Sequence, residues 1–296
     1  MKTITTIFSL LIILLFSSCQ KELDIDLPTG GNGTTNDSTV LWKYLQVDTK
    51  LPPGLDTLGF SLFEYDNQDR ISKINLYDRS DTSSSSAYTG HAETKYYYSG
   101  NDTLPFKTTF FTNDFGFAMT DTIYYNYQQG FVSYDSSISF LDDPFGPTRY
   151  MTVRNFSNGG SNVASNQKTY TWIYPSPPFL CESNLIYVIG YLNGNIVSEN
   201  GSSTGCGVGG WDIQASYDNK VNPFYSLSIP YRTLLDSRGF FQLQQKNNTT
   251  ETVSSSMNQH TKSSYTYRND GYPLVVRVQD LFDIDHGYKG IYFYTR

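Results

Sequence analysis

The feature that most constrains the fold is the stretch Leu62–Tyr77, two short runs of alternating residues around a polar centre. In its second run, the apolar residues Ile74 and Leu76 alternate with polar ones. Successive side chains of a strand point to opposite faces, so this alternation indicates a half-buried strand. The centre, Asp66–Asp69, is rich in Asp and Asn, whose side chains favour turns. The stretch therefore predicts a β-hairpin.

The same plan recurs along the chain. A copy spans Lys95–Thr109, and polar turns at Gln128–Gly130 and Arg268–Gly271 separate further alternating runs. Asp-Gly between two such runs is a strong hairpin signal. Aromatic residues make up 16% of the 296 residues, with 25 Tyr and 19 Phe, and both types favour strands. We predict an all-β antiparallel meander of successive hairpins over residues 41–296, forming a large twisted sheet or stacked sheets.

Three segments depart from this plan. The run Asn155–Asn166 is polar and predicts a loop. Asp218–Lys220 predicts a turn after a strand, because Asp and Asn favour turns. Ile229–Leu235 is the one stretch that we expect to form a short helix.

The N-terminus carries an export signal. Ile7–Phe16 is an apolar run of about ten residues, too short for a membrane span of roughly 20. Ser17-Ser18-Cys19 follows and resembles a bacterial lipobox, with Phe16 in place of the usual Leu. We expect residues 1–18 to be a lipoprotein signal peptide and Cys19 to carry lipid, such as palmitate. The alternative is an ordinary signal peptide beside an unmodified cysteine.

The residues after Cys19 indicate a sorting signal and a flexible tether. Gln20-Lys21-Glu22 resembles the signal that sends Bacteroidota lipoproteins to the outer face of the outer membrane, or else is simply polar. Leu27–Thr39 is rich in Gly, Thr, Asn and Asp, the composition of a linker. We therefore expect a flexible tether over residues 19–40.

Cys181 and Cys206 are the other two cysteines. An exported chain meets an oxidising environment, so we predict a disulfide between them, with two free thiols as the alternative. A zinc site is disfavoured, because neither has a second Cys or His at ligand spacing.

The charge excludes some partners. The formal net charge is −7, and it becomes −8 when residues 1–18, with Lys2, are removed. Such a chain lacks the basic clusters that bind nucleic acid or anionic membranes. Membrane attachment is therefore expected through the lipid on Cys19.

No motif for chemistry stands out. His91 and His260 lie in polar stretches that we expect to be solvated loops, and His286 closes a cluster with Asp283 and Asp285 that lacks EF-hand spacing. We expect no catalytic residue, metal or cofactor.

The aromatic surplus has two interpretations. Trp42, Trp172 and Trp211, or some of the many tyrosines, could form a platform for a sugar or peptide. Alternatively, these aromatic residues could pack across strands as most strand aromatics do.

Three signatures in the C-terminal third support a resemblance: Tyr217–Phe224, Lys246–Asn248, and Tyr265–Tyr267 with Asp270–Pro273. They resemble a family of Bacteroidota surface lipoproteins with a YDNKxNPF-type motif and Tyr-rich hairpins. The hairpins are also similar, more weakly, to the Tyr-Asp repeats of Rhs-type shells. The family likeness covers residues 41–296 and implies a β-rich, lipid-anchored exterior protein, with no catalytic residues to carry over.

We therefore expect a non-catalytic outer-membrane lipoprotein that faces the exterior and acts as a β scaffold or interaction protein. The alternative is a glycan-binding module for polysaccharide capture. Its partner would be a protein or a glycan.

Overall fold

The computed structural model describes residues 40–48, 57–78, 90–114, 117–128, 131–142, 147–158, 162–173, 178–193, 195–206, 209–226, 245–256, 258–281 and 287–295. The chain divides into two compact units, Met1–Asn36 and Asp37–Arg296. The expected signal peptide, Cys19 and the stretch Leu27–Thr39 lie outside the described residues, as does the expected helix Ile229–Leu235.

Within its described residues, the second unit contains sixteen strands and one short 3-10 helix. The strands are β1 Val40–Asp48, β2 Thr57–Tyr65, β3 Ile71–Asp78, β4 Gly90–Tyr97, β5 Lys107–Asp114, β6 Phe117–Gln128, β7 Phe131–Asp142, β8 Thr148–Asn158, β9 Asn162–Ile173, β10 Phe179–Leu192, β11 Asn195–Gly205, β12 Gly209–Val221, β13 Asn247–Ser254, β14 Gln259–Tyr267, β15 Pro273–Asp280 and β16 Gly287–Thr295. The helix, η1, spans Pro223–Ser226.

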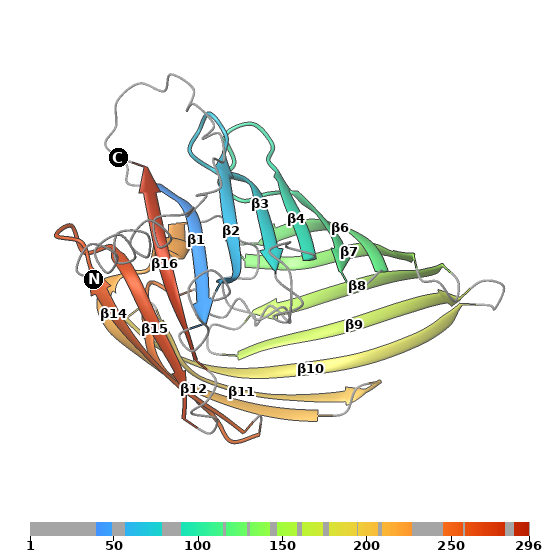
Figure 1. The fold of residues 1–296 in the computed structure, drawn as a ribbon. Helices are drawn as coiled ribbons and strands as arrows, with labels where there is room; N and C mark the ends of the chain where they lie inside the picture. The colour runs from blue at the N-terminus through green and yellow to red at the C-terminus, as the bar shows by residue number, and fades with distance from the viewer. Residues whose placement is uncertain are drawn as a thin grey trace, which may run out of the picture. The chain divides into compact units, whose positions relative to one another are not determined.

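Each strand pairs antiparallel with its neighbours in sequence, and β1 pairs with β16, so the sheet closes into a barrel (Figure 1). The closing pairs run from Val40 with Thr295 to Asp48 with Tyr288. The predicted all-β antiparallel meander is confirmed. The sheet is a single one, neither open nor stacked, because closure gives the edge strands β1 and β16 hydrogen-bond partners.

The hairpin at Asp66 forms as predicted. The Asp66 carboxylate accepts hydrogen bonds from the backbone N–H of Gln68 at 2.8 Å and of Arg70 at 3.0 Å. The Arg70 guanidinium pairs with the same carboxylate at 2.6 Å. Asp69 has a φ of 58°, a left-handed conformation that Asp tolerates better than most residues. One acidic side chain thus organises the whole turn.

Two local predictions are wrong. Asn155–Asn166 is not a loop, since β8 continues to Asn158 and β9 begins at Asn162. Its residues pair across the two strands, as Asn155 does with Asn166 and Ser157 with Ala164. Asp218–Lys220 is part of β12, although the pairing register with β13 shifts there. In both places polar side chains stand on the wall of the barrel.

Phe224 shows which face of the sheet is the inside. It follows β12, yet its ring lies 5.7, 5.9 and 5.8 Å from the rings of Tyr44 on β1, Phe63 on β2 and Tyr292 on β16. Strands β13, β14 and β15 stand between β12 and β16 in the wall. Only a path across the interior brings Phe224 to these three side chains. Because directly paired residues share a face, the strand registers then assign every strand position to this inner face or to the outer face.

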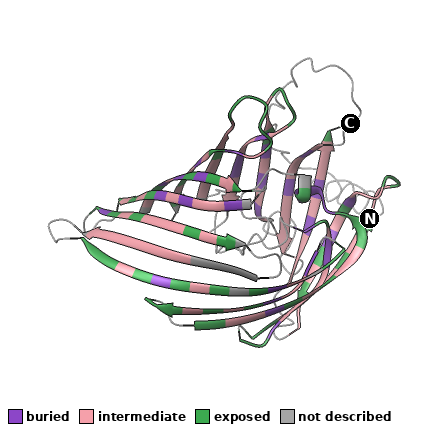
Figure 2. Cartoon of the chain, turned by 180° about the vertical axis from the view of Figure 1, so that it is seen from behind, coloured by how far each residue is buried: buried purple, intermediate pink, exposed green. Residues whose placement is uncertain are grey.

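The core of the barrel lies on the inner face. Its largest cluster gathers around Phe224 and includes Leu41, Ile74 and Val276. Smaller clusters form around Ile123 with Tyr125 and around Ile189 with Ile196. Buried and exposed positions are interspersed along the same strands (Figure 2), as expected when alternate side chains face the interior.

The terminal rim is the end of the barrel at which β1 begins and β16 finishes. Tyrosine hydroxyls bind this rim together. A tyrosine on or just after each of β2, β4, β6, β12, β14 and β16 donates a hydrogen bond to a carbonyl at or near the start of the preceding strand. The bonds are Tyr65–Leu41 (2.8 Å), Tyr98–Ile71 (2.8 Å), Tyr127–Pro105 (2.6 Å), Tyr217–Ile196 (2.6 Å), Tyr265–Thr249 (2.9 Å) and Tyr294–Pro273 (2.8 Å). This set, the tyrosine ring, explains the Tyr-rich hairpin motif.

Burial keeps these phenols neutral. It raises the pKa of Tyr65, Tyr127 and Tyr294 well above the usual value for tyrosine. Each hydroxyl therefore remains a donor throughout the physiological pH range, and each accepting carbonyl keeps its partner.

Removing one bond of the tyrosine ring should destabilise the barrel. Tyr127→Phe keeps the ring but leaves the Pro105 carbonyl without its donor, which costs about 1–2 kcal/mol in unfolding free energy. Tyr124→Phe is the matched control, because Tyr124 lies on the outer face of the same strand and is 46% exposed. Urea unfolding followed by circular dichroism would measure both, and equal effects would contradict a specific role for the Tyr127 hydroxyl.

Candidate functional site

The three signature stretches of the C-terminal third converge where β12 meets β13 and β14. The Asp218 carboxylate is their centre. It accepts hydrogen bonds from the backbone N–H of Lys220 at 2.8 Å and of Asn248 at 3.2 Å, and from the Tyr267 hydroxyl. Tyr267 and Asn248 thereby hold β14 and β13 to β12, so the three signature stretches meet in one hydrogen-bonded group around Asp218.

Asn222 turns the chain inward at the end of β12. Its side-chain amide donates to the Gln245 carbonyl at 3.0 Å, and its side-chain oxygen accepts from the Phe224 N–H at 3.0 Å. The second bond caps η1, where Pro223 occupies the first helical position that proline favours. Asn222 is 3% exposed, so these polar groups have little access to water. We call Asn222, Pro223, Phe224 and Gln245 the latch.

Gln245 and Asn247 anchor the other end of the latch. The Gln245 side chain accepts a hydrogen bond from the backbone N–H of Ile196 at 2.7 Å. Asn195 and Asn247 exchange two bonds of 2.8 and 3.0 Å. Gln245 and Asn247 are thus fastened to the start of β11, and the motif residues place Phe224 in the aromatic core.

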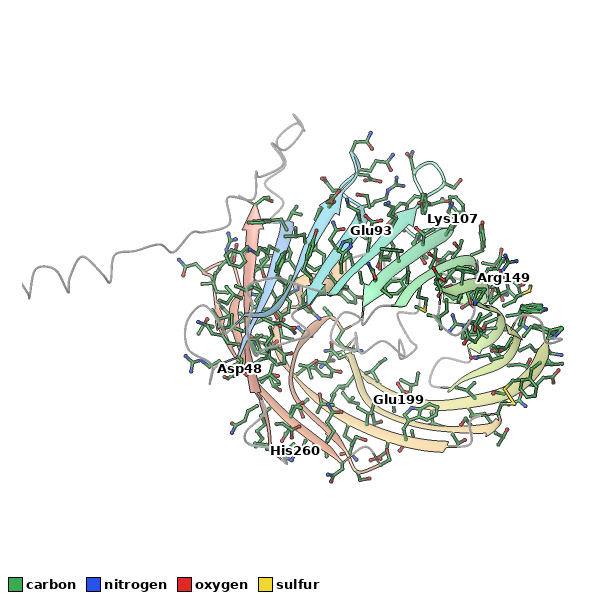
Figure 3. The ribbon with its side chains drawn as sticks, turned by 45° about the vertical axis from the view of Figure 1, so that its right-hand side comes forward. Asp48, Glu93, Lys107, Arg149, Glu199 and His260 are labelled. Carbon is green, nitrogen blue, oxygen red and sulfur yellow. A yellow bond between two sulfur atoms is a disulfide. The ribbon has the colours of Figure 1, made fainter. Side chains whose placement is uncertain are left out.

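A second feature of the inner face is a buried acid. Glu199 on β11 is 1% exposed and lies directly opposite Ile189 on β10 and Ile213 on β12. Its Oε1 accepts a hydrogen bond from the Trp211 indole N–H at 2.7 Å, while its Oε2 has no hydrogen-bond partner among the described residues. Burial raises the pKa of Glu199 to about 7. Figure 3 labels Glu199 on the strand wall.

A glycine on β11 leaves room for the hydrogen bond between Glu199 and Trp211. Gly201 is paired with Trp211 across β11 and β12, and a Cβ at Gly201 would overlap the indole ring. Glycine is therefore required where Trp211 lies flat against β11 to reach Glu199.

The outer face carries ion pairs along the strands. Glu64 pairs with Lys73 at 2.6 Å, and Lys168 with Glu182 at 2.9 Å. Further pairs are Glu93 with Lys95 at 2.7 Å and Glu251 with Lys262 at 3.7 Å. Glu93, Lys168, Glu251 and Lys262 lie well inside their strands rather than at the rims. Charged pairs therefore stand on the outer face of β2–β4, β9–β10 and β13–β14.

The predicted disulfide is confirmed. Cys181 and Cys206 are bonded, with Cα atoms 5.7 Å apart. Around it, the Cys206 N–H donates to the Glu182 carbonyl at 3.2 Å and the Ser183 hydroxyl to the Cys206 carbonyl at 2.8 Å. The bridge fastens the start of β10 to the end of β11.

The histidines differ from expectation. His91 lies on β4 rather than in a loop and packs on the Tyr77 ring at 5.0 Å. His260 lies on β14 and is within 2.8 Å of Glu251; their hydrogen bond lowers the pKa of that carboxyl. His286, with Asp283 and Asp285, lies outside the described residues. Within those residues, no three His, Cys, Asp or Glu side chains are placed to hold a metal ion.

The structure does not bring the three tryptophans together. Trp42 on β1 packs on Phe293, Trp172 on β9 stacks with Tyr170, and Trp211 on β12 faces the interior. They belong to separate parts of the wall, so a shared platform does not form. In the described part of the chain there is also no helix with the length and apolarity needed to cross a membrane.

No protein-family model and no curated protein matches the chain. Among solved structures, the chain is similar to a porin-like protein from Bacteroides vulgatus, with 14% identity and a TM-score of 0.48 over 87% of this chain and 99% of that one. It is also similar to a porin-like protein from Bacteroides uniformis, with 12% identity and a TM-score of 0.45 over 86% and 96% of the two chains.

The latch should depend on the Asn222 amide. Asn222→Ala leaves the Gln245 carbonyl and the Phe224 N–H without these partners in a buried place, so we expect a loss of about 2 kcal/mol in unfolding free energy. Asn219→Ala, at an exposed position of the same strand, should change it by less than about 0.5 kcal/mol. Urea titration monitored by tryptophan fluorescence tests this, and similar losses for the two variants would argue against the latch.

Glu199 should make stability depend on pH. Its folded pKa of about 7 lies above the usual 4.5, so the folded state favours the protonated form. The contribution of Glu199 to the free energy of unfolding is fully present below about pH 4.5. It falls by up to about 3 kcal/mol as the pH rises from there through 7.

Glu199→Gln has no such titration. We expect the variant to be more stable than the unaltered protein at pH 8 and to lose this advantage at pH 5, as measured by thermal unfolding at both values. An identical pH dependence for the two proteins would show that Glu199 is not the titrating group.

Proposed function

We propose that this protein is an outer-membrane lipoprotein whose barrel stands outside the bilayer and acts as a non-catalytic scaffold or interaction protein. Cys19 would hold it through lipid, and the stretch after Cys19 would link that lipid to the terminal rim, where β1 begins at Val40.

The observation that carries the proposal is the charged outer face. A barrel that crosses a bilayer presents an apolar band about 25 Å tall to lipid. Here ion pairs such as Lys168–Glu182 and Glu251–Lys262 stand within the strands on that face. A charge on the lipid-facing side costs roughly 2–4 kcal/mol at the bilayer midplane. Water is therefore the better solvent for this surface, and membrane attachment requires a separate device.

A scaffold is better supported than the glycan-binding module. A glycan platform needs aromatic side chains that converge on one surface, whereas Trp42, Trp172 and Trp211 lie on β1, β9 and β12. The latch and the tyrosine ring both serve the rigidity of the wall. A rigid barrel with a solvated exterior suits a protein that presents surfaces to partners.

Replacing the lipidated cysteine separates this proposal from a membrane-spanning barrel. We expect the unaltered protein to incorporate radiolabelled palmitate and to remain with the outer membrane after a carbonate wash. Cys19→Ser should lose the label and be released by the carbonate wash, which removes proteins held only at the membrane surface. Because a spanning barrel is held by its strands, retention of unlabelled Cys19→Ser protein in the washed membrane would overturn the proposal. Cys181→Ser is the control, since it should keep the label.

A further inference from the structure

One group of apolar side chains on the outer face lies close together across four strands. It lies on β7–β10, beside the rim opposite the terminal rim. We call it the apolar edge, and it consists of Ile138, Phe140, Met151, Tyr170, Trp172 and Leu180. Ile138 is 56% exposed and Leu180 45%.

The register places these side chains in two adjoining rows. Ile138 pairs with Met151, Met151 with Tyr170, and Tyr170 with Leu180, so one row crosses four strands. In the row nearer the rim, Phe140 pairs with Arg149, which pairs with Trp172. The Tyr170 and Trp172 rings stack at 6.2 Å, which joins the two rows.

The apolar edge is shallow. On the side away from the rim, the next row contains the Lys168–Glu182 ion pair. Two rows of alternate residues span only about 7 Å along a strand. This is far less than the roughly 30 Å of a bilayer core, but it matches the 5–10 Å to which interfacial segments enter the headgroup boundary.

The chemistry of the apolar edge favours lipid over other occupants. Tyr and Trp prefer the membrane interface. Arg149, labelled in Figure 3, lies over the Phe140 ring at 5.8 Å, so its charge can reach the headgroups while its stem covers the ring. Asp142 ends β7 on the same face, so the two charges offset each other and insertion would be driven by apolar burial.

Chain length allows the contact. The chain from Cys19 to Val40 can extend about 70 Å at most, at roughly 3.3 Å per residue. The longest strand, β10, has 14 residues and is about 46 Å long. The lipid on Cys19 and the apolar edge can therefore reach the same bilayer when the barrel lies on its side.

We propose that the apolar edge is a second membrane contact, which rests the side of the barrel on the phospholipid surface that carries the anchor. This proposal builds on the lipidated placement described above. The two contacts together would give the barrel a defined orientation, with β2–β4 and β13–β14 turned away from the edge.

The test uses the full-length chain with Cys19→Ser, so that binding to vesicles cannot come from lipid. The probe is phosphatidylcholine vesicles containing a brominated lipid, which quenches tryptophans that enter the interface. We expect the protein to cosediment with the vesicles and its fluorescence to be quenched. Binding should change little when a quarter of the lipid is replaced by phosphatidylglycerol, because Arg149 and Asp142 offset each other.

Two double variants supply the comparison. Ile138→Ser with Leu180→Ser should lower the partition coefficient at least tenfold, since both remove exposed apolar area from the apolar edge. Ile186→Ser with Val188→Ser should leave it unchanged, because these residues are 54% and 51% exposed on the outer face of β10 but lie beyond the Lys168–Glu182 pair.

Absence of binding to vesicles, or equal losses in the two double variants, would overturn the apolar edge as a lipid contact. Binding that requires phosphatidylglycerol would also overturn it, in favour of an electrostatic contact. Palmitate labelling of Cys19 is measured separately. A protein that is labelled but does not bind vesicles through the edge would leave the lipoprotein assignment intact.

Discussion

The hydrogen bond from a half-buried tyrosine hydroxyl to the backbone of the preceding strand is the interaction on which this barrel most depends. It repeats around the terminal rim, on strands as far apart as β2 and β12. In each case a bulky ring fills the interior while its hydroxyl satisfies a carbonyl near the start of a strand. A phenylalanine would fill the same space but would leave a buried acceptor unpaired, which is the costlier condition. The tyrosine surplus is thus a requirement of this rim.

A large barrel has more interior than its wall can fill, and the latch helps to meet that need. Strands of an eight-stranded barrel can fill the centre with their own side chains, whereas wider barrels leave space. Here the chain crosses the interior after β12 and supplies Phe224 to the opposite wall. Gly290 shows how tightly this region is packed, because a Cβ there would overlap the Tyr44 ring. The polar residues that flank Phe224 satisfy the backbone of the crossing segment.

The hairpins could be predicted from the sequence because their signals are local. Asp66 bonds to groups at most four residues away, and Gly271 supplies the positive φ of 89° that its turn needs. Closure could not be predicted in this way, since the partners of β1 lie about 250 residues further along the chain. The polar composition of Asn155–Asn166 led to the wrong prediction of a loop. Polar residues there continue the strands and pair with residues of the neighbouring strand. The predicted turn at Asp218 was wrong for a related reason. Besides its local hydrogen bond to Lys220, the Asp218 carboxylate accepts one from Asn248 on the next strand.

The helix start in the latch has a recognisable sequence pattern. An asparagine followed by proline and an aromatic residue is typical of a capped helix start, and Asn222-Pro223-Phe224 forms such a start. Pattern alone could not show that the helix points inward, because that direction depends on Gln245 and on the turn before β11.

Charged side chains stand within the strands on the outer face of this barrel. The same alternation that puts apolar groups outside a membrane barrel here puts Phe63, Ile74 and Tyr292 inside and Lys73 and Glu93 outside. Architecture alone therefore does not decide which solvent surrounds the wall; the polarity of the outer positions does. Among the outer positions, Ile138, Met151 and Leu180 form a row of exposed apolar side chains. Water solvates this row poorly, and any surface that covers it gains the free energy of its burial.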